Sequence, residues 1–248
     1  MRKHLPPAIL ILLMVGVWEL FVRILGVPVY LFPPPSLVAQ ALWENAARLA
    51  GHFGTTMLES VLGFGLGSGL GLVLATLFFH VRAVKESTYP IAIGIQSTPT
   101  IAVAPLLILW FGNGIMTKVV AAALLSFFPV LVNCMKGFNA VPPEAVDLFK
   151  SLGSGKTQLF LKLRFPHALP YLFSGLKVGA SLAVVGAIVG EFTGGDKGLG
   201  GIIVTSGFLL ETPTMFAAIL LASLGGISLL GVVALLEKRV LHWHHARD

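Results

Sequence analysis

The chain has 248 residues, of which 56% are hydrophobic and only 11% are charged. Soluble domains usually carry about 25% charged residues, so this composition, with its apolar residues gathered in long runs, excludes an ordinary soluble enzyme and predicts an all-α integral membrane protein. The net charge of +6 does not indicate a nucleic-acid partner, because the basic residues cluster between the apolar runs, as membrane topology signals do.

Six segments have the roughly 20 mostly apolar residues that a membrane-spanning helix needs. They cover residues 7–26, 57–79, 90–110, 115–137, 168–191 and 213–236. The first run is longer than the apolar core of a signal peptide, which is about 7–15 residues, and no small-residue cleavage site follows it. It also carries Glu19 and Arg23, one helical turn apart, which we expect to pair. We therefore expect a retained helix.

The distribution of basic residues predicts the orientation of these spans. If the N-terminus is cytoplasmic, only four of the 17 Lys and Arg residues lie near the outer side, namely Arg23, Arg48, Lys118 and Lys197. Cytoplasmic loops carry the excess of Lys and Arg, so both termini are expected in the cytoplasm.

The outer segment between the first two spans starts with prolines, which prevent one continuous helix. From Ser36 onward an amphipathic pattern follows, and Ser36 is a suitable N-cap. We predict a helix lying at the outer surface of the membrane. Its apolar residues are Leu37, Ala41, Leu42 and Leu49, set against the polar Gln40, Glu44, Asn45 and Arg48.

The second span is rich in glycine, and Gly63, Gly67 and Gly71 recur every four residues. A dinucleotide-binding G-x-G-x-x-G motif needs a strand-to-helix turn, which this apolar run does not offer. Small residues at a four-residue spacing instead predict close packing of two membrane helices.

The cytoplasmic segment 138–167 contains Gly155-Lys156-Thr157, which resembles the end of a nucleotide-binding P-loop. A P-loop also has a glycine five residues before the second one and joins a strand to a helix. This chain has Lys150 at that position, and no strand-like run precedes it. We therefore expect no nucleotide to bind here.

The same segment favours a short helix, a turn and a second helix. Pro143 suits a helix start, and Gly153 and Gly155 can end the helix by adopting positive φ. Glu144 and Asp147 complement the helix dipole in the first turn. The apolar face, at helical spacing, consists of Ala145, Leu148, Phe149 and Leu152.

This segment resembles the cytoplasmic loop of permease subunits of bacterial ABC importers, whose signature is E-A-A, three residues, G, nine residues and I-x-L-P. Aligned on Gly153, the chain has Asp147-Leu148-Phe149 and Leu163-Arg164-Phe165-Pro166 at matching spacing. The departures are D-L-F in place of E-A-A and hydrophobic exchanges at Leu163 and Phe165. Leu-Phe-Pro-Pro-Pro-Ser after the first span, Ala104–Gly112, Leu169–Gly179 and a Gly-Leu-Gly after the fifth span extend the resemblance to the nitrate, sulfonate and taurine permease group.

The resemblance implies a type I ABC importer permease fold, as a single transmembrane domain over residues 1–248. It implies that the short cytoplasmic helix docks on a separate ATPase subunit, the alternative being a helix that lies on lipid. Asp147, the first residue of the D-L-F triplet, keeps the negative charge of the family's glutamate on a shorter side chain. Docking is therefore still expected, without the contacts that need the longer glutamate. The docking residues would be Glu144, Ala145, Asp147, Leu148, Phe149, Lys150, Leu152 and Gly153.

The partners that the resemblance implies are a second permease copy, two ATPase subunits and a periplasmic or lipid-anchored solute-binding protein, in the bacterial cytoplasmic membrane. ATP and Mg²⁺ would bind the ATPase, and this chain would hold no cofactor. The transported nutrient would be a sulfonate-, taurine- or nitrate-like anion, or a small heterocyclic or aromatic compound.

Polar side chains inside spans are costly in lipid and tend to face a cavity or a partner helix. In the third span, lining a pathway and repairing the backbone near Pro99 and Pro105 remain equal alternatives. Glu191 suits either an external gate or an interface position beside Lys197. The pathway candidates are Gln96, Ser97, Thr98, Thr100, Asn133 and Glu191.

We expect no catalytic and no metal-binding residues. The histidines at 242, 244 and 245 lie close together in the tail, where we expect a solvated or headgroup-facing end and no metal site. Cys134, in an apolar run, suits a packed position. The rival functions are a secondary carrier, which predicts an inverted repeat and paired intramembrane carboxylates, and an intramembrane enzyme, which predicts converging catalytic side chains. The sequence gives no evident sign of either.

Overall fold

The computed structural model describes residues 5–81, 83, 86, 87, 94, 98–194 and 197–242, and its regular elements are all helical. In chain order they are α1 (Leu5–Ile24), α2 (Pro35–Glu44), α3 (Ala46–His80), α5 (Thr100–Phe111), α6 (Ile115–Asn139), α7 (Pro143–Ser151), α8 (Lys156–Leu159), the π-helical η1 (Phe160–Arg164), α9 (Phe165–Phe192), α10 (Leu199–Phe208) and α11 (Thr212–Val240).

Four helices among the described residues are long and apolar enough to cross a membrane. They are Ala46–His80, Ile115–Asn139, Lys156–Phe192 and Thr212–Val240, and each contains most or all of one predicted span. Helix α1 covers most of predicted span 7–26. Much of predicted span 90–110, including Gln96 and Ser97, lies outside the described residues, and α5 covers only its second half.

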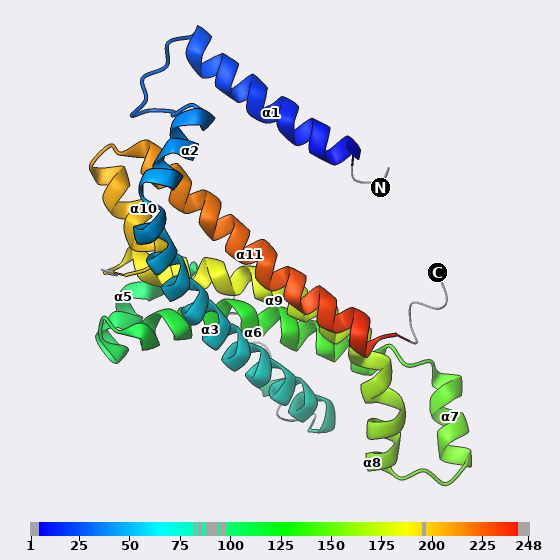
Figure 1. Ribbon diagram of the computed structural model, residues 1–248. Helices are drawn as coiled ribbons and strands as arrows, with labels where there is room; N and C mark the ends of the chain where they lie inside the picture. Colours follow the sequence, from blue (N-terminus) through cyan, green and yellow to red (C-terminus); the bar gives the residue numbers. More distant parts are fainter. Residues whose placement is uncertain are drawn as a thin grey trace.

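Helix α6 is the centre of the bundle, with its most extensive contacts to α9 and α3 (Figure 1). The predicted close packing of the second span is confirmed, because Gly63, Gly67 and Gly71 all lie directly against the backbone of α6. A Cβ at Gly71 would stand 2.8 Å from the Phe127 carbonyl oxygen, a distance that side chains do not tolerate.

An adjoining face of α6 meets a second row of glycines, which the sequence analysis missed. On α9 these are Gly175, Gly179, Gly186 and Gly190, and a Cβ at each would approach α6 atoms at 3.1 Å or less. Helices whose backbones come this close gain dispersion contacts that lipid chains cannot supply. The stacking of α3, α6 and α9 is therefore fixed by small residues.

Helix α11 packs along α9, and α10 and α2 cover its first turns. Lys177 of α9 donates to Glu237 of α11 at 2.9 Å, which ties the two helices near the end of α11. Helix α1 extends away from the bundle along most of its length (Figure 1). It touches the rest mainly through α2 and through the ring of Trp18, which meets Phe32 and Phe216.

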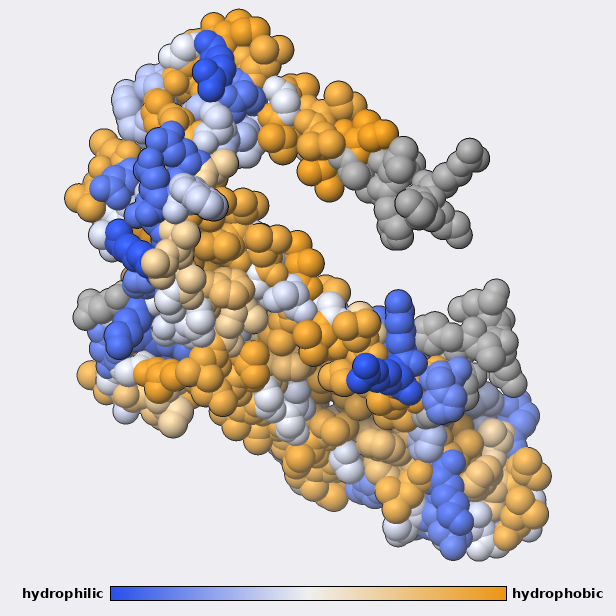
Figure 2. All heavy atoms as spheres, in the orientation of Figure 1, coloured by the Kyte–Doolittle hydropathy of each residue, from blue (hydrophilic) through white to orange (hydrophobic). Residues whose placement is uncertain are grey.

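The surface is apolar along the helices and polar near two ends (Figure 2). One polar end carries α2 and the start of α3, and the other carries α7 and α8. This is the distribution expected for a protein whose middle contacts hydrocarbon and whose ends contact water.

The prediction of one surface helix from Ser36 to Leu49 was wrong about where this helix ends. Helix α2 ends at Glu44, Asn45 interrupts it, and Leu49 is a buried residue of α3. Ser36 is also not the N-cap, because α2 begins one residue earlier, at Pro35, after Pro34.

The cap of α2 comes instead from α1. Glu19 Oε2 accepts the backbone N–H of Ser36 at 2.9 Å, and Glu19 Oε1 accepts its hydroxyl at 2.8 Å. The predicted pair of Glu19 with Arg23 is confirmed, at 2.5 Å. The carboxylate thus satisfies a free N–H at the helix start, where negative charge is favourable.

Candidate functional site

Helix α7 forms the short helix predicted in segment 138–167, and it begins at Pro143 as expected. Gly153 follows it with φ of +77°, a left-handed conformation that non-glycine residues rarely adopt. The prediction for Gly155 was wrong, because its φ is −72° and it precedes α8. The Gly-Lys-Thr stretch therefore joins two helices, unlike a P-loop, which joins a strand to a helix.

The apolar residues of α7 differ in exposure: some are buried and others face solvent. Val146 is buried against the rest of the protein, whereas Leu148 is 58% exposed and Leu152, just after the helix, is 74% exposed. Ala145 and Phe149 are half-buried. Two large apolar side chains exposed beside each other, at the polar end of the molecule, form a surface suited to another protein.

The polar neighbours on α7 face solvent. Lys150 Nζ lies 3.3 Å from Asp147 Oδ1, and both side chains are more than 60% exposed. Glu144 is exposed in the first turn. An exposed pair of this kind adds little to stability, so these charges are available to a partner surface.

The stem from α8 to α9 joins α7 to the bundle. Lys156–Phe192 is one continuous run of helix, so the second helix predicted in segment 138–167 continues without interruption into the fifth predicted span. The π-helical turn η1 ends just before Pro166. Proline removes one helical hydrogen bond and crowds the preceding turn, and a wider turn relieves that crowding.

The stem is anchored by aromatic packing. Phe160 is buried, and its ring lies 5.1 Å from that of Phe138 at the end of α6 and 5.7 Å from that of Phe79 at the end of α3. Arg164 donates from Nη1 to the Phe138 carbonyl at 2.7 Å, and its guanidinium lies 4.9 Å from the centre of the Phe79 ring. Movement of α7 would therefore reach α3 and α6 directly.

The predicted pathway residues do not form one cluster among the described residues. Gln96 and Ser97 lie outside that part, and Thr100 is placed by its backbone as the first residue of α5. Thr98 is exposed. Asn133 is half-buried on α6 and donates to the Pro129 carbonyl at 2.8 Å, within its own helix.

Glu191, the last pathway candidate, is buried, with 1% of its surface exposed. It accepts hydrogen bonds from the Thr56 hydroxyl at 2.7 Å and from the backbone N–H of Gly200 at 2.5 Å. Lys197, its suggested neighbour at an interface, is exposed to solvent, whereas Glu191 is not. Glu191 thus belongs to a polar network inside the bundle.

Glu59 is the functional candidate that the sequence analysis missed. It is 4% exposed and its carboxyl group meets that of Glu191. Lys118 of α6 is equally buried and faces the same pair. The carboxylates are far apart in sequence, so only the polar positions themselves, in otherwise apolar runs, could have signalled this network.

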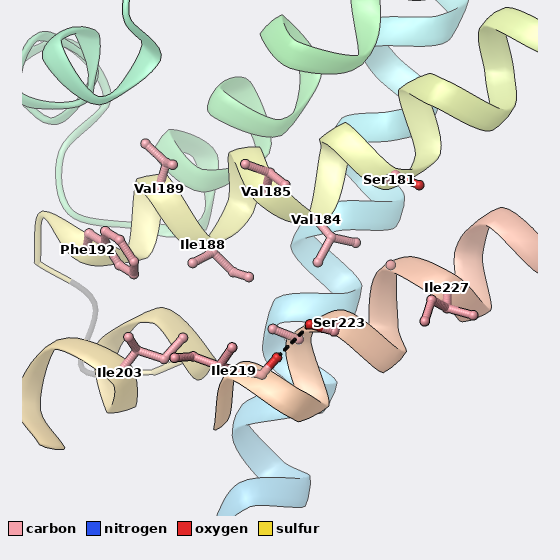
Figure 3. A pocket seen from close by; sticks show the side chains of 12 residues that line it. Ser181, Val184, Val185, Ile188, Val189, Phe192, Ile203, Ile219, Ser223 and Ile227 are labelled. Carbon is pink, nitrogen blue, oxygen red and sulfur yellow. Dashed lines mark hydrogen bonds between the residues drawn. The ribbon is translucent and has the colours of Figure 1, made fainter. Parts of the chain in front are cut away.

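A hollow of about 570 Å³ lies between α9 and α11, with α10 at one end (Figure 3). Val184, Ile188 and Ile227 are typical of its lining, and Ser181 and Ser223 supply the hydroxyl groups. The Ser223 hydroxyl already donates to the Ile219 carbonyl at 3.0 Å. This apolar surface matches hydrocarbon better than a hydrated anion.

No group of three or more His, Cys, Asp or Glu side chains converges within the described part of the chain. His244 and His245 lie outside that part, and Cys134 is buried in the hydrophobic core, as predicted.

Comparison with known proteins gives a consistent result. The family described as "Binding-protein-dependent transport system inner membrane component" matches residues 67–242. The riboflavin transport system permease protein RibX of Chloroflexus aurantiacus is 36% identical over 239 residues, covering 96% of this chain and 89% of the relative. The formylaminopyrimidine transport permease protein ThiX of Halalkalibacterium halodurans is 34% identical over 242 residues, covering 97% and 96%.

Permeases named for taurine and for aliphatic sulfonates also match, at 27% to 29% identity. Among solved structures, the MetNI methionine ABC transporter in an inward-facing conformation contains a chain with a TM-score of 0.57 and 19% identity. That similarity covers 84% of this chain and 98% of the other, and it concerns the fold.

Proposed function

The chain belongs to the family of binding-protein-dependent transport system inner membrane components and is the permease subunit of an ABC importer; from this premise we propose how its parts serve transport. Such a subunit is a multi-pass protein of the inner membrane that works with an ATPase and a solute-binding protein. We propose six spans with both termini in the cytoplasm, and a homodimer of this chain with two ATPase subunits.

Helix α7 would be the coupling helix that docks on the ATPase. The observation that carries this proposal is the exposed pair of Leu148 and Leu152 beside the left-handed turn at Gly153, at the positions of the importer signature. Leucine side chains of this size gain about 1.5–3 kcal/mol each when fully buried. Phe149 would complete the contact, with Asp147 and Lys150 at its rim.

ATP and Mg²⁺ would bind the ATPase subunits, and this chain would hold no cofactor. Gly155 immediately precedes α8, and Lys156 and Thr157 are its first residues, so the stretch lacks the backbone loop that surrounds phosphates in a P-loop. Transport by this chain therefore depends on a partner for its energy.

The stem would carry the movement of the ATPase into the membrane. When ATP closes the ATPase dimer, the two α7 helices approach each other, and Phe160 and Arg164 pull on the ends of α3 and α6. The pathway would then open toward the binding protein, and hydrolysis would reset it inward. This alternating access requires elements with two discrete arrangements.

We propose a small heterocyclic nutrient as the substrate class, with a sulfonate- or taurine-like anion as the second candidate. The relatives named for riboflavin and formylaminopyrimidine are 34% to 36% identical over nearly the whole chain, more than those named for taurine and sulfonates. We keep the proposed outer gate at Glu191. The proposed lining of the pathway consists of Gln96, Ser97, Thr98, Thr100 and Asn133.

The test is uptake by proteoliposomes that contain this chain with its cognate ATPase and solute-binding protein. Uptake of labelled riboflavin, formylaminopyrimidine and taurine is measured with ATP or a non-hydrolysable analogue inside. We expect uptake of one heterocycle that requires ATP and all three components. Uptake by this chain alone would overturn the importer proposal, and uptake of taurine only would overturn the substrate class.

A further inference from the structure

A buried polar network joins four helices at the end of the bundle opposite α7. Thr56 and Glu59 come from α3, Lys118 from the first turn of α6 and Glu191 from the last turn of α9. All four are 5% exposed or less. The fourth helix, α10, contributes backbone N–H groups from the Gly-Leu-Gly motif at its start.

The motif is held against Glu191 by a chain of hydrogen bonds. The N–H of Gly200 donates to Glu191 Oε2 at 2.5 Å, and the N–H of Leu199 donates to Thr56 Oγ1 at 2.8 Å. Thr56 in turn donates to Glu191 Oε1 at 2.7 Å. The fit leaves no room for a side chain at Gly198, since a Cβ there would overlap the Glu191 carboxyl group. Glu191 therefore acts as an acceptor at both oxygens.

Glu59, in contrast, lacks such donors at one of its oxygens among the described residues. Its carboxyl group meets that of Glu191, yet Glu59 Oε2 is buried and no donor points to it within the described part of the chain. Two ionised carboxylates in contact repel each other strongly away from water. A protonated Glu59 removes the repulsion and supplies a donor, so its hydroxyl can give Glu191 another hydrogen bond.

The charges around the pair agree with one bound proton. Lys118 is the cation that faces both carboxyl groups, and its Nζ donates to the carbonyl and side-chain oxygens of Asn113, both at 3.0 Å. On the side of α10, His52 Nδ1 lies 3.0 Å from the Gly198 carbonyl and is engaged there. One lysine balances one carboxylate, and a proton neutralises the other.

We propose that Glu59 and Glu191 share one proton, carried by Glu59 and donated to the Glu191 carboxylate. This bridge joins α3 to α9 and, with the Gly200 and Leu199 N–H bonds that hold α10 to the same residues, forms a clasp of the three helices. The clasp itself is a property of the folded chain. Its role in transport rests on the proposed function: it would make the ends of α3, α9 and α10 move as one unit when the pathway opens toward the binding protein.

The proposal predicts how stability depends on pH. The folded protein binds a proton that an exposed glutamate releases in the unfolded state at neutral pH. Stability then falls as pH rises, because the folded state binds more protons than the unfolded state. Glutamine at position 59 supplies a permanent N–H donor of nearly the same shape, so this loss should vanish in Glu59→Gln.

The experiment measures thermal melting of the purified permease–ATPase complex from neutral to alkaline pH. The variants are wild type, Glu59→Gln, Glu191→Ala, which removes the acceptor, and the matched control Glu44→Gln, an exposed glutamate of α2. We expect Glu59→Gln to melt at or above the wild-type temperature at neutral pH. As the pH rises, its melting temperature should fall less than that of wild type, whereas Glu44→Gln should show the full wild-type decline. Glu191→Ala should melt lower at every pH.

Infrared spectra of the wild-type complex provide a readout that requires no variant to fold. A protonated carboxyl group gives a C=O band distinct from that of a carboxylate, and we expect one such band, absent in Glu59→Gln. The proposal is overturned if wild type lacks the band, or if Glu59→Gln melts as low as Glu191→Ala or keeps the full alkaline decline. These results do not depend on uptake, so they are separable from a failure of the transport test.

Discussion

Arg164 donates a hydrogen bond of 2.7 Å from Nη1 to the backbone carbonyl of Phe138, and this contact joins the stem after α7 to the last turn of α6. The same guanidinium lies over the Phe79 ring of α3. One side chain thus connects the docking region to two central helices. With the short link of residues 140–142 between α6 and α7, the stem offers a second route by which a movement of the ATPase can reach the membrane.

Replacing Arg164 should uncouple ATP hydrolysis from transport. Arg164→Met keeps most of the length of the side chain but loses a charge-assisted hydrogen bond, worth about 1.5–3 kcal/mol, and the contact with the Phe79 ring. We expect transport per ATP hydrolysed to fall about tenfold, while the ATPase still co-purifies. Lys162→Met, on the same turn but exposed, is the control, and equal losses in both variants would contradict a specific role for Arg164.

Charge on the exposed face of α7 should weaken binding of the ATPase strongly. Leu152→Asp places a carboxylate where the proposed interface buries an apolar side chain, at a cost of about 2 kcal/mol or more, or about 30-fold in Kd. Co-purification with the tagged ATPase measures the effect. Trp43→Asp, which alters an 86% exposed residue of α2, should leave binding unchanged. Full binding by Leu152→Asp would count against docking through α7.

Removing Lys156 should leave ATP hydrolysis intact. Lys156 is exposed at the start of α8, where it has no P-loop geometry. For Lys156→Ala we expect nucleotide binding and hydrolysis by the assembled complex within about twofold of wild type, since surface substitutions usually change stability by less than about 0.5 kcal/mol. A complete loss of nucleotide binding would show that this chain contributes a nucleotide site.

A bulky residue at Gly153 should impair coupling, whereas a small one at Gly155 should not. Gly153 has φ of +77°, which costs a β-branched residue roughly 1–2 kcal/mol or more. Gly155 has φ of −72°, and nothing lies within 4 Å of a Cβ there. We expect Gly153→Val to lower transport per ATP severalfold and Gly155→Ala to match wild type. A larger loss of transport in Gly155→Ala than in Gly153→Val would mean that Gly153 does not determine the turn.

The glycine row on α3 supplies a matched pair of variants for helix packing. A Cβ at Gly67 would overlap the Ala123 carbonyl oxygen and the Ser126 hydroxyl, whereas a Cβ at Gly65 meets nothing within 4 Å. Overpacking of this kind costs about 1–3 kcal/mol. Gly67→Ala should therefore lower the melting temperature of the purified protein, and Gly65→Ala should keep or slightly raise it. Similar melting of the two variants would contradict the packing of α3 on α6.

Local features of the sequence were enough to predict most of the helices and the candidate docking segment. Long apolar runs have to be helical in a membrane because lipid cannot satisfy backbone hydrogen bonds, and the runs at 57–79, 115–137, 168–191 and 213–236 all became helices. Pro143 and Gly153 mark the two ends of α7 through their own backbone preferences. These signals lie within a few residues of the structure that they determine.

Tertiary structure decided the features whose partners are distant in the chain. Ser36 was expected to cap its own helix, but Glu19 of α1 takes that role. Leu49 was expected on the surface helix, but it is buried in α3. Glu191 could be assigned to a gate or to an interface from sequence, and only folding placed it against Glu59, Thr56 and the Gly-Leu-Gly backbone. A paired carboxylate of this kind was expected only for a carrier. Sequence fixes where polar residues interrupt apolar helices, whereas packing decides which of them meet, because a buried charge requires a partner wherever the chain provides one.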